Sequence, residues 1–260
     1  MNTTTLSPNN QPATATAATS WTPFSYIVTN LARFIRPDEI TFSGVNSTMP
    51  MLACLLAKKA YDWDFVYINV AGGVDPQPSQ IPLSSSDPVL AERTASIFDN
   101  EDFYDLCCRG RMDLTFLGAA QIDGEGNANN SCIGDWHHPK VRLPGGGGGA
   151  VMLPTARRAC TWRTEHSRRT FVESLHFRTS WGGFHGVVTP IAVFVKKDNR
   201  LALQSWHPES SLEEVRERTG FDFDAGGATP TPLPTEREIA ALAELDPSGQ
   251  FERDAAVTLR

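Results

Sequence analysis

The sequence of 260 residues has neither an excess of basic side chains nor a long apolar run. Its 23 Lys and Arg residues are outnumbered by 30 Asp and Glu residues, which gives a formal net charge of -7. Proteins that bind duplex nucleic acid usually have a basic balance instead. No apolar segment approaches the roughly 18–20 residues that a membrane-spanning helix requires. We therefore expect neither nucleic acid nor a membrane among its partners.

Cysteine is sparse, and its spacing fits no common framework. Five cysteines occur, two of them adjacent, and none belongs to a Cys-x-x-Cys pair. An odd number without paired spacing argues against a disulfide scaffold or a zinc ribbon and favours the reducing cytoplasm. His137 and His138 are neighbours, and adjacent residues seldom direct both rings at one ion, so we predict no metal site.

The common signature motifs of catalysis are missing as well. The sequence contains no nucleophile elbow, Walker A loop or dinucleotide fingerprint. Segment 123–129 is dense in side-chain oxygens but fails as a calcium loop, because its sixth position is Ala128 and the twelfth is Gly134. We interpret the segment as a tight turn in which Asp and Asn side chains bond their own backbone.

Apolar spacing predicts helices and strands that alternate in the first half of the chain. Residues 1–20, rich in Thr, Asn, Ala and Pro, predict a disordered tail ahead of one domain over 21–260. The predicted helices span 24–35, 47–60, 103–108, 210–218 and 235–245, and the strands span 40–42, 65–70, 113–117, 161–164, 170–177, 191–195 and 201–206. The fold class is therefore α/β, an open, mainly parallel sheet flanked by helices.

Three predicted strands end in small residues. Gly44 follows the first, Gly72-Gly73 the second and Gly118-Ala119-Ala120 the third. In an open parallel sheet, ligands bind in the crevice beyond the carboxyl ends of the strands. An ordinary turn explains any one of these segments alone, but together they predict a ligand site at that edge.

Five consecutive glycines, Gly145 to Gly149, are the most informative feature that the chain does have. Glycine loses the most backbone freedom on folding, so an ordered run of it is costly. The run either presents backbone amides to a ligand oxygen or phosphate, or forms a flexible surface loop. It lacks the Lys-Ser/Thr pair that a P-loop needs.

The one basic concentration is a group of arginines in the second half. Its members are Arg157, Arg158, Arg163, Arg168, Arg169 and Arg178. A guanidinium group binds phosphate or carboxylate through paired N–H donors. Charge runs are usually exposed, however, so we expect most of these arginines to lie on a solvated face.

The order of three motifs points to a family. The segment 118–123 reads Gly-Ala-Ala-Gln-Ile-Asp, Gly126-Asn127 and Asn129 follow, and Pro144 with the glycine run completes the series. This order resembles the β subunit of family I coenzyme A (CoA) transferases, in which a G-x-x-Q-[VI]-D and G-N-x-N stretch precedes a Gly-Gly-Ala loop. The resemblance spans about residues 24–247.

The resemblance implies an α/β subunit that pairs with a homologous α subunit and binds an acyl-CoA between the two. CoA then enters as part of the substrate, and no cofactor is bound permanently. The backbone amides of Gly146 and Gly147 are the implied donors to the oxyanion that forms at the thioester. The implied substrate-binding or CoA-binding residues are Gly44, Asn69, Gly72, Gly73, Gly118, Ala119, Gln121, Asn127, Gly145, Gly148, Gly149 and Ala150.

The sequence departs from the transferases at the end of one strand. Transferases of this family carry a glutamate nucleophile after the strand that matches 65–70, whereas this strand ends at Val70. The segment is more similar to two relatives without transferase activity. One decarboxylates a glutaconyl-type CoA ester and has a cysteine near this place, and the other opens a ring of a steroid-derived CoA ester by hydrolysis.

We therefore favour a lyase or hydrolase reaction, with Val70 at the vacated nucleophile position. Desolvation next to an apolar side chain favours loss of CO2 from a bound carboxylate. Two alternatives stay open. One is a transferase with a displaced nucleophile, for which Glu92, Glu101 and Glu125 are the nearby carboxylates. The other is a non-catalytic subunit that binds CoA esters.

Overall fold

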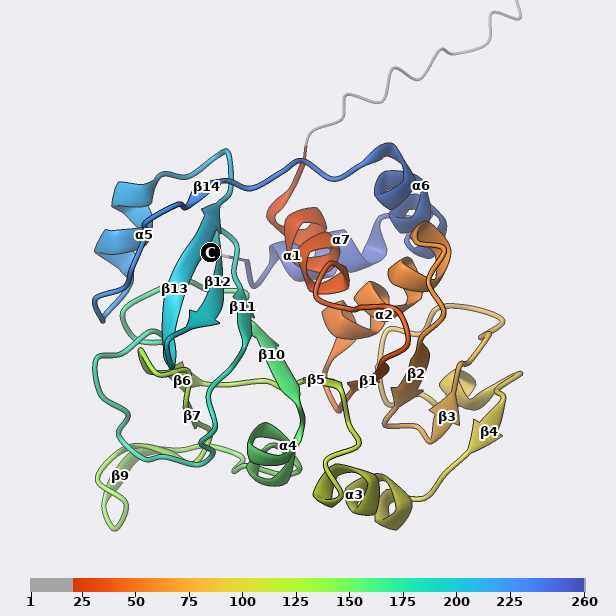
Figure 1. The fold of residues 1–260 in the computed structure, drawn as a ribbon, viewed down its shortest axis with the longest axis horizontal. Coiled ribbons are helices and arrows are strands. Elements are labelled where there is room, and N and C mark those ends of the chain that lie inside the picture. Colours follow the sequence, from red (N-terminus) through yellow and green to blue (C-terminus); the bar gives the residue numbers. More distant parts are fainter. Residues whose placement is uncertain (1–20, 260) are drawn as a thin grey trace, which may run out of the picture.

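A ten-stranded sheet runs through the whole molecule (Figure 1). The computed structural model describes residues 21–259, so the predicted tail, residues 1–20, lies outside the described residues. In spatial order the strands are β14 (Thr229–Pro230), β13 (Arg200–Trp206), β12 (Ala192–Lys197), β11 (Gly186–Val188), β10 (Arg158–Trp162), β5 (Leu114–Phe116), β1 (Ile40–Ser43), β2 (Val66–Asn69), β3 (Gly73–Val74) and β4 (Ser96–Ile97).

The centre of the sheet is parallel. Strands β11, β10, β5, β1 and β2 all pair in parallel. Antiparallel pairs extend the sheet on both sides, and β14 closes one end by pairing in parallel with β13. β12 and β13 form a hairpin whose turn, Asp198-Asn199, has positive φ at both residues, as a two-residue hairpin turn of this kind requires. The predicted α/β class with an open, mainly parallel sheet is confirmed, with a mixed character at its two ends.

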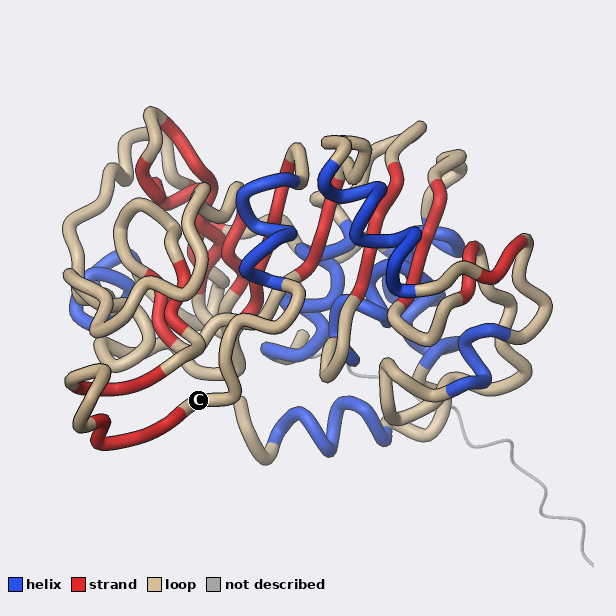
Figure 2. The backbone as a smooth tube through the Cα atoms, turned by 90° about the horizontal axis from the view of Figure 1, so that it is seen from below, coloured by secondary structure: helices blue, strands red, loops and turns tan. Residues whose placement is uncertain are grey.

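Helices cover both faces of the sheet. Helices α1 (Pro23–Ala32), α2 (Thr48–Ala60), α6 (Glu236–Leu245) and α7 (Gln250–Ala256) lie together on one face. Helices α3 (Asn100–Cys108) and α4 (Gly149–Thr155) lie on the other face, and Figure 2 shows the strands side by side behind them. Helix α5 (Leu212–Arg218) and a single 3-10 turn, η1 (Pro88–Ala91), complete the set. Every helix within 21–259 is too short or too polar to cross a membrane.

The core follows the predicted apolar pattern. Leu52 and Leu56 of α2 are fully buried, and each such side chain contributes roughly 1.5–3 kcal/mol on burial. Thr235 caps the start of α6: its hydroxyl accepts from the Glu238 amide, and the Glu238 side chain accepts from the Thr235 amide, so these two backbone donors are satisfied. All five cysteines are unpaired thiols.

Two predicted strands in the second half are wrong in place or kind. Residues 170–177 form no strand, because Phe171 is held in the core as an isolated bridge to Ile122 and stacks on His166. The strand predicted at 161–164 lies earlier, as β10, because its apolar register continues backwards to Arg158. Helices α4 and α7 escape prediction, since neither has a side-chain N-cap: α4 begins within the glycine run, and α7 follows Gly249.

Two buried histidines make the fold sensitive to acid. The ring nitrogens of His166 lie 2.9 Å from Thr189 Oγ1 and 3.0 Å from Thr219 Oγ1, and burial lowers the His166 pKa to about 3. Burial likewise lowers the pKa of His207 to about 4. Both folded-state pKa values lie below the ordinary value of 6.5, so the unfolded chain takes up these protons first and stability is lost as the pH falls below 6.5.

We expect the free energy of unfolding to fall by about 3 kcal/mol between pH 6.5 and pH 5, from the two histidines together. Urea titrations followed by circular dichroism at a series of pH values measure this slope. A His166→Gln variant should have roughly half of it, whereas the exposed His137→Gln variant should keep all of it. An unchanged slope in His166→Gln would contradict the assignment.

Candidate active site

The carboxyl ends of β2, β1 and β5 meet at one edge of the sheet, which we call the carboxyl edge. Ser43 pairs with Asn69 on one side and with Phe116 on the other. The next residue of each strand therefore continues the register, and Val70 follows β2 beside Gly44 after β1. Neighbouring strands are about 4.8 Å apart, so the ends of β2 and β5 are roughly 10 Å apart. The predicted meeting of these small-residue ends is confirmed.

Val70 faces the side of the sheet that carries α3 and α4. Side chains alternate along a strand, so Val70 points the same way as Ile68, and both pack against the apolar cluster that includes Phe103 of α3. The Phe103 ring stacks on Phe42 of β1 at a centroid distance of 4.1 Å. The half-buried Val70 side chain thus lies in apolar surroundings at the end of β2.

The three alternative carboxylates lie on other segments. Glu92 is exposed and accepts hydrogen bonds from the amide and hydroxyl of Ser79 at 3.0 and 2.7 Å. Glu125 is exposed and accepts from Asn127 Nδ2 at 3.0 Å. Glu101 is exposed in the first turn of α3. In the described part of the chain, no hydrogen bond connects any of the three to the turn that holds Val70.

Asn69 and the glycines after Val70 build a tight turn. The buried Asn69 Nδ2 donates to Gly73 O at 3.1 Å and to Leu90 O at 3.0 Å, and Oδ1 accepts from Ala71 N at 3.0 Å. A Cβ on Gly73 would lie 2.2 Å from Leu90 O, and Gly72 has φ +95°. Asn69, Gly72 and Gly73, which were predicted to bind a ligand, therefore form the turn itself, and none of them faces open space.

The glycine run is fastened to the carboxyl edge by Asn130. The Gly145 amide donates to Asn130 O at 2.7 Å, and Asn130 Nδ2 donates to Gly118 O at 2.9 Å. Asn130 Oδ1 also accepts from Ala120 N at 2.7 Å. The run is consequently ordered beside the end of β5, and Gly118 itself is exposed, with no atom within 4 Å of an added Cβ.

Two glycines of the run lie so close to neighbouring side chains that a Cβ would not fit. A Cβ on Gly146 would lie 2.8 Å from Thr179 Cγ2, and one on Gly148 would lie 2.7 Å from Tyr104 Oη of α3. Gly147 has φ +49° and faces open space. Among the described residues, the amides of Gly146, Gly147 and Gly148 have no hydrogen-bond acceptor. Unpaired N–H groups beside the carboxyl edge can stabilise an oxyanion.

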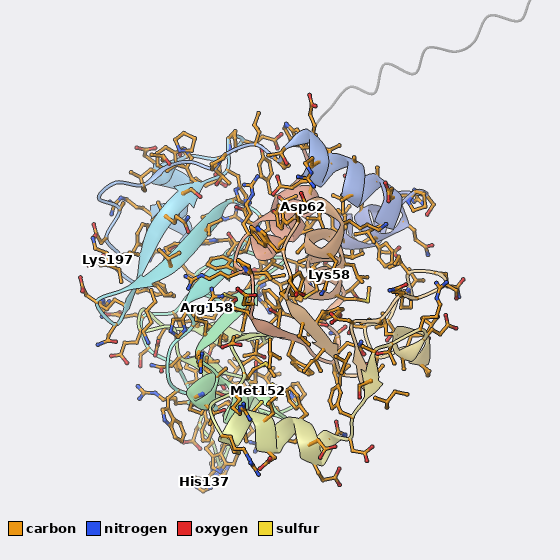
Figure 3. All side chains as sticks on the ribbon, turned by 45° about the vertical axis from the view of Figure 1, so that its right-hand side comes forward. Lys58, Asp62, His137, Met152, Arg158 and Lys197 are labelled. Carbon is orange, nitrogen blue, oxygen red and sulfur yellow. The ribbon has the colours of Figure 1, made fainter. Side chains whose placement is uncertain are left out.

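The glycine run ends in a helix. Gly149 and Ala150 form the first turn of α4, which also contains Met152. The Met152 sulfur lies 3.5 Å from Thr115 Oγ1 of β5, and Figure 3 shows Met152 between α4 and α3. Helix α4 thus holds the run against the sheet.

The motif residues before the run shape a small hairpin, β6 (Gln121–Ile122) with β7 (Ala128–Asn129). Gln121 is buried, and its Oε1 accepts from Asn129 Nδ2 at 2.8 Å. Asn127 Nδ2 donates to Asp123 Oδ2 at 3.1 Å, and Asp123 Oδ1 accepts from the amides of Glu125 and Asn127. The predicted tight turn is confirmed, and both Gln121 and Asn127 serve to position the hairpin that carries Asn130.

A second hairpin follows, β8 (Cys132–Gly134) with β9 (Pro139–Arg142), and it carries the adjacent histidines. His137 and His138 are exposed, their amides donate to Asp135 Oδ1, and His137 lies at the periphery of the molecule (Figure 3). Residues 21–259 hold no group of three or more His, Cys, Asp or Glu side chains that could bind a metal ion.

A cleft of about 480 Å³ opens at the carboxyl edge, on the side of α1 and α7. Segments after β1, β5 and β10 line it, among them Asn46, Gly118 and Arg163. Arg163 Nη1 donates to Ala119 O at 2.8 Å. Four of the six arginines noted in the sequence are exposed, as predicted, namely Arg157, Arg168, Arg169 and Arg178. Of the other two arginines, Arg158 forms an ion pair with Glu39, and Arg163 lines the cleft.

Sequence reasoning missed two contributors to this region. Asn130 connects the glycine run to the end of β5, and the run of asparagines at 129–130 was the available signal. Tyr104 of α3 lies against Gly148, but nothing in the sequence connects residues so far apart. The twelve predicted ligand-binding residues fall into two equal sets. Gly44, Gly118, Gly145, Gly148, Gly149 and Ala150 are exposed or half-buried, whereas Asn69, Gly72, Gly73, Ala119, Gln121 and Asn127 are buried.

Three comparisons with known proteins agree with this architecture. The model of the coenzyme A transferase family matches residues 25–218. One of the subunits of the 3-oxoadipate CoA-transferase of Pseudomonas knackmussii is 32% identical over 83% of this chain and 89% of its own length. The IpdB subunit of the cholesterol ring-cleaving hydrolase of Rhodococcus jostii is 27% identical over 59% of this chain and 67% of its own length.

Among solved structures, the decarboxylase AibA/AibB has a TM-score of 0.82 at 29% identity, over 89% of this chain and 98% of that chain. Its variant with valine in place of one cysteine is 30% identical, whereas the alanine, asparagine and serine variants at the same position are 29% identical. Enzymes of the family use CoA thioesters as substrates, and the relatives include transferases, a decarboxylase and a hydrolase. With its family model, its fold and the order of its loops in agreement, this chain belongs to the coenzyme A transferase family, as a β-subunit-like member.

Proposed function

We propose that this chain is the β subunit of a heteromeric lyase that pairs with a homologous α subunit and removes CO2 from an acyl-CoA. The observation that carries the proposal is the half-buried, apolar Val70 at the end of β2, where the transferases of the family carry their nucleophile. Relatives that are themselves named as single subunits of CoA-transferases support the α partner. On this proposal the isolated chain is inactive.

The apolar surroundings of Val70 suit decarboxylation. When the C–CO2 bond breaks, its electron pair moves into the thioester and gives an enolate, which is then protonated on carbon. A carboxylate ground state loses more from desolvation than the charge-dispersed transition state does. The unpaired amides of Gly146, Gly147 and Gly148 are the donors available to the enolate oxygen.

The decarboxylase comparison supports the same reading. That enzyme is 29% identical over 89% of this chain, at a TM-score of 0.82. Val70 stands near the place where, by the resemblance, the decarboxylase-type relatives carry a cysteine.

A hydrolase is the second candidate, supported by the ring-cleaving hydrolase among the relatives. Neither a lyase nor this hydrolase forms a covalent glutamyl intermediate. Measurements of CoA exchange and of hydroxylamine capture therefore distinguish both from a transferase. A non-catalytic CoA-ester-binding subunit would show neither bond cleavage nor exchange in the complex.

The test uses the chain co-expressed with its α subunit and incubated with glutaconyl-CoA. We expect release of CO2, no exchange of CoA between acyl-CoA and free acid, and no hydroxamate on the protein after treatment with hydroxylamine, because only a glutamyl anhydride or thioester would give one there. Inactivity on glutaconyl-CoA, together with hydrolytic cleavage of a ring carbon–carbon bond in a cyclic acyl-CoA, would favour the hydrolase. Robust exchange with hydroxylamine capture would refute the proposal in favour of a transferase that uses Glu92, Glu101 or Glu125.

A further inference from the structure

The Tyr104 hydroxyl lies against the glycine run, although Tyr104 belongs to a different helix. A Cβ added to Gly148 would lie 2.7 Å from Tyr104 Oη and 3.4 Å from the ring carbon Cε1. The phenol therefore occupies the space that a side chain at position 148 would need. Helices α3 and α4 lie side by side on this face of the sheet (Figure 1), so the hydroxyl of one helix reaches the backbone at the start of the other.

This hydroxyl has no hydrogen-bond partner in the part of the chain that the structure describes. The Tyr61 hydroxyl donates to Glu238 Oε1 at 2.5 Å, and the Tyr67 hydroxyl shares a hydrogen bond of 2.7 Å with Ser43 Oγ. Tyr104 Oη forms no such bond within residues 21–259, and 37% of the residue is exposed. Since a phenolic O–H is a donor, Tyr104 keeps a donor available for a ligand at the glycine run.

The aromatic neighbours of Tyr104 hold its ring in place. The ring centroids of Phe103 and Tyr104 are 5.4 Å apart in an edge-on arrangement, and the buried Phe103 stacks on Phe42. Phe103 also belongs to the apolar cluster that includes Val70. Tyr104 thus adjoins the surroundings of Val70 through Phe103, and it adjoins the glycine run through its hydroxyl. A donor that is fixed before the reaction needs no reorganisation during it.

We propose that Tyr104 Oη donates a hydrogen bond to the thioester oxygen as this oxygen takes on the negative charge of an enolate. It acts together with the amides of Gly146, Gly147 and Gly148, which are unpaired within the described residues. This inference rests on the proposed function, because it takes the thioester to lie at the glycine run. The proton stays on Tyr104 and no covalent bond to the tyrosine forms. Backbone amides and tyrosine hydroxyls both serve as donors to oxyanions.

The surroundings of the run favour a charge that forms during the reaction over a permanent anion such as a phosphate of CoA. The side chains that approach the run are those of Thr179, Ser180, Met152 and Tyr104, and none of them carries a charge. A permanent anion that leaves water needs a paired cation to offset its desolvation. An enolate oxygen gains its charge in place, and neutral donors aimed at it lower the barrier.

The test compares steady-state CO2 release from glutaconyl-CoA by the complex with the α subunit, with and without Tyr104→Phe. We expect kcat to fall by about 10²-fold, the usual cost of one oxyanion donor. KM should change by less than about twofold, because the contact forms only in the transition state. Phenylalanine keeps the ring, and the lost hydroxyl has no partner in residues 21–259, so unchanged CoA affinity in isothermal titration should show an intact fold.

Cys108→Ser is the matched control, since Cys108 is exposed one turn further along α3 and should leave kcat unchanged. A second readout combines Tyr104→Phe with Gly147→Val. Donors to one oxygen act as a unit, so Tyr104→Phe should cost less than about tenfold in the Gly147→Val background. A merely structural role of Tyr104 would give the same factor in both backgrounds, and that result would overturn the proposal.

Unchanged kcat in Tyr104→Phe would overturn the proposal as well, and so would a raised KM at unchanged kcat, which would assign the hydroxyl to substrate binding. CoA exchange is measured alongside, because a nucleophile that attacks a thioester also leaves an oxyanion. A complex that exchanged CoA, with an exchange rate that fell about 10²-fold in Tyr104→Phe, would refute only the proposed lyase reaction and would support the role of Tyr104.

Discussion

On the proposed function, replacing Val70 by glutamate is expected to replace the release of CO2 by exchange of CoA between acyl-CoA and free acid. A carboxylate at this place can attack the thioester carbonyl, which breaks the C–S bond and leaves an acyl anhydride and CoA thiolate. The thiolate then attacks the glutamyl carbonyl and releases the acid, so that CoA is held as a glutamyl thioester. Release of CO2 should fall by about 10²-fold, or roughly 2.7 kcal/mol, because a carboxylate in place of Val70 ends the apolar surroundings and repels the substrate carboxylate.

The measurement follows three signals in the Val70→Glu complex: CO2 release, CoA exchange between acyl-CoA and free acid, and hydroxylamine capture on the protein. Val70→Gln is the matched control, because it adds the same bulk and polarity without a nucleophilic carboxylate. It should lose CO2 release without gaining exchange or capture. If Val70→Glu folded, bound acyl-CoA and kept full CO2 release with no capture, Val70 would not face the thioester.

Replacing Gly147 by valine should lower kcat for CO2 release by about 10²–10³-fold, the usual cost of losing one oxyanion donor. Gly147 has φ +49°, a conformation that a β-branched residue adopts only under strain, and its missing Cβ faces open space. Valine would therefore displace the amide and project a side chain over the run. Steady-state kinetics, together with size-exclusion chromatography of the complex, measures the loss of turnover with the assembly intact.

Gly227→Val is the matched control, which shows whether a loss of turnover in Gly147→Val comes from the lost amide donor or from backbone strain. Gly227 also has positive φ, +86°, and open space around an added Cβ, but it lies in the segment before the edge strand β14. The two variants should share a stability cost of order 1–3 kcal/mol for the strained residue. Only Gly147→Val should lose turnover, and equal losses of kcat in both variants would remove the glycine run from the mechanism.

The central sheet could be predicted from the sequence because parallel strands carry a strong local pattern. Residues 65–70 are almost continuously apolar, as a strand covered on both faces must be, and β2 with its neighbours bears this out. The small residues after each strand also meet at one edge, since strands that run in the same direction end on the same side.

The second half is less predictable because its local pattern is ambiguous. Apolar and polar residues alternate at 170–177 as they would in a strand, yet Phe171 is fixed by its packing on His166, a contact that only the folded chain provides. Helix α4 starts inside the glycine run, where helix propensity is poor, and it is held in place through Met152 against β5.

The roles of individual site residues are the hardest to anticipate. Gln121 and Asn127 stand in the family motif and invite a ligand-binding role, yet their side chains bond within the β6–β7 hairpin. Arg163 cannot be distinguished from its exposed neighbours in the sequence, because its burial depends on β5 and the loop that follows β5. The order of the motifs thus identifies the region of the candidate site, whereas the role of each residue in it follows only from the three-dimensional contacts.

The bonds of Asn130 have a consequence for how this scaffold can change its chemistry. Asn130 holds the loop amide of Gly145 and the carbonyl of Gly118, and neither bond involves the end of β2. On the proposed function, the residue that would decide the reaction, Val70, is therefore separate from Asn130, which fastens the proposed donor loop. A single exchange at position 70 would then change the reaction of the thioester and leave the backbone amides of that loop in place.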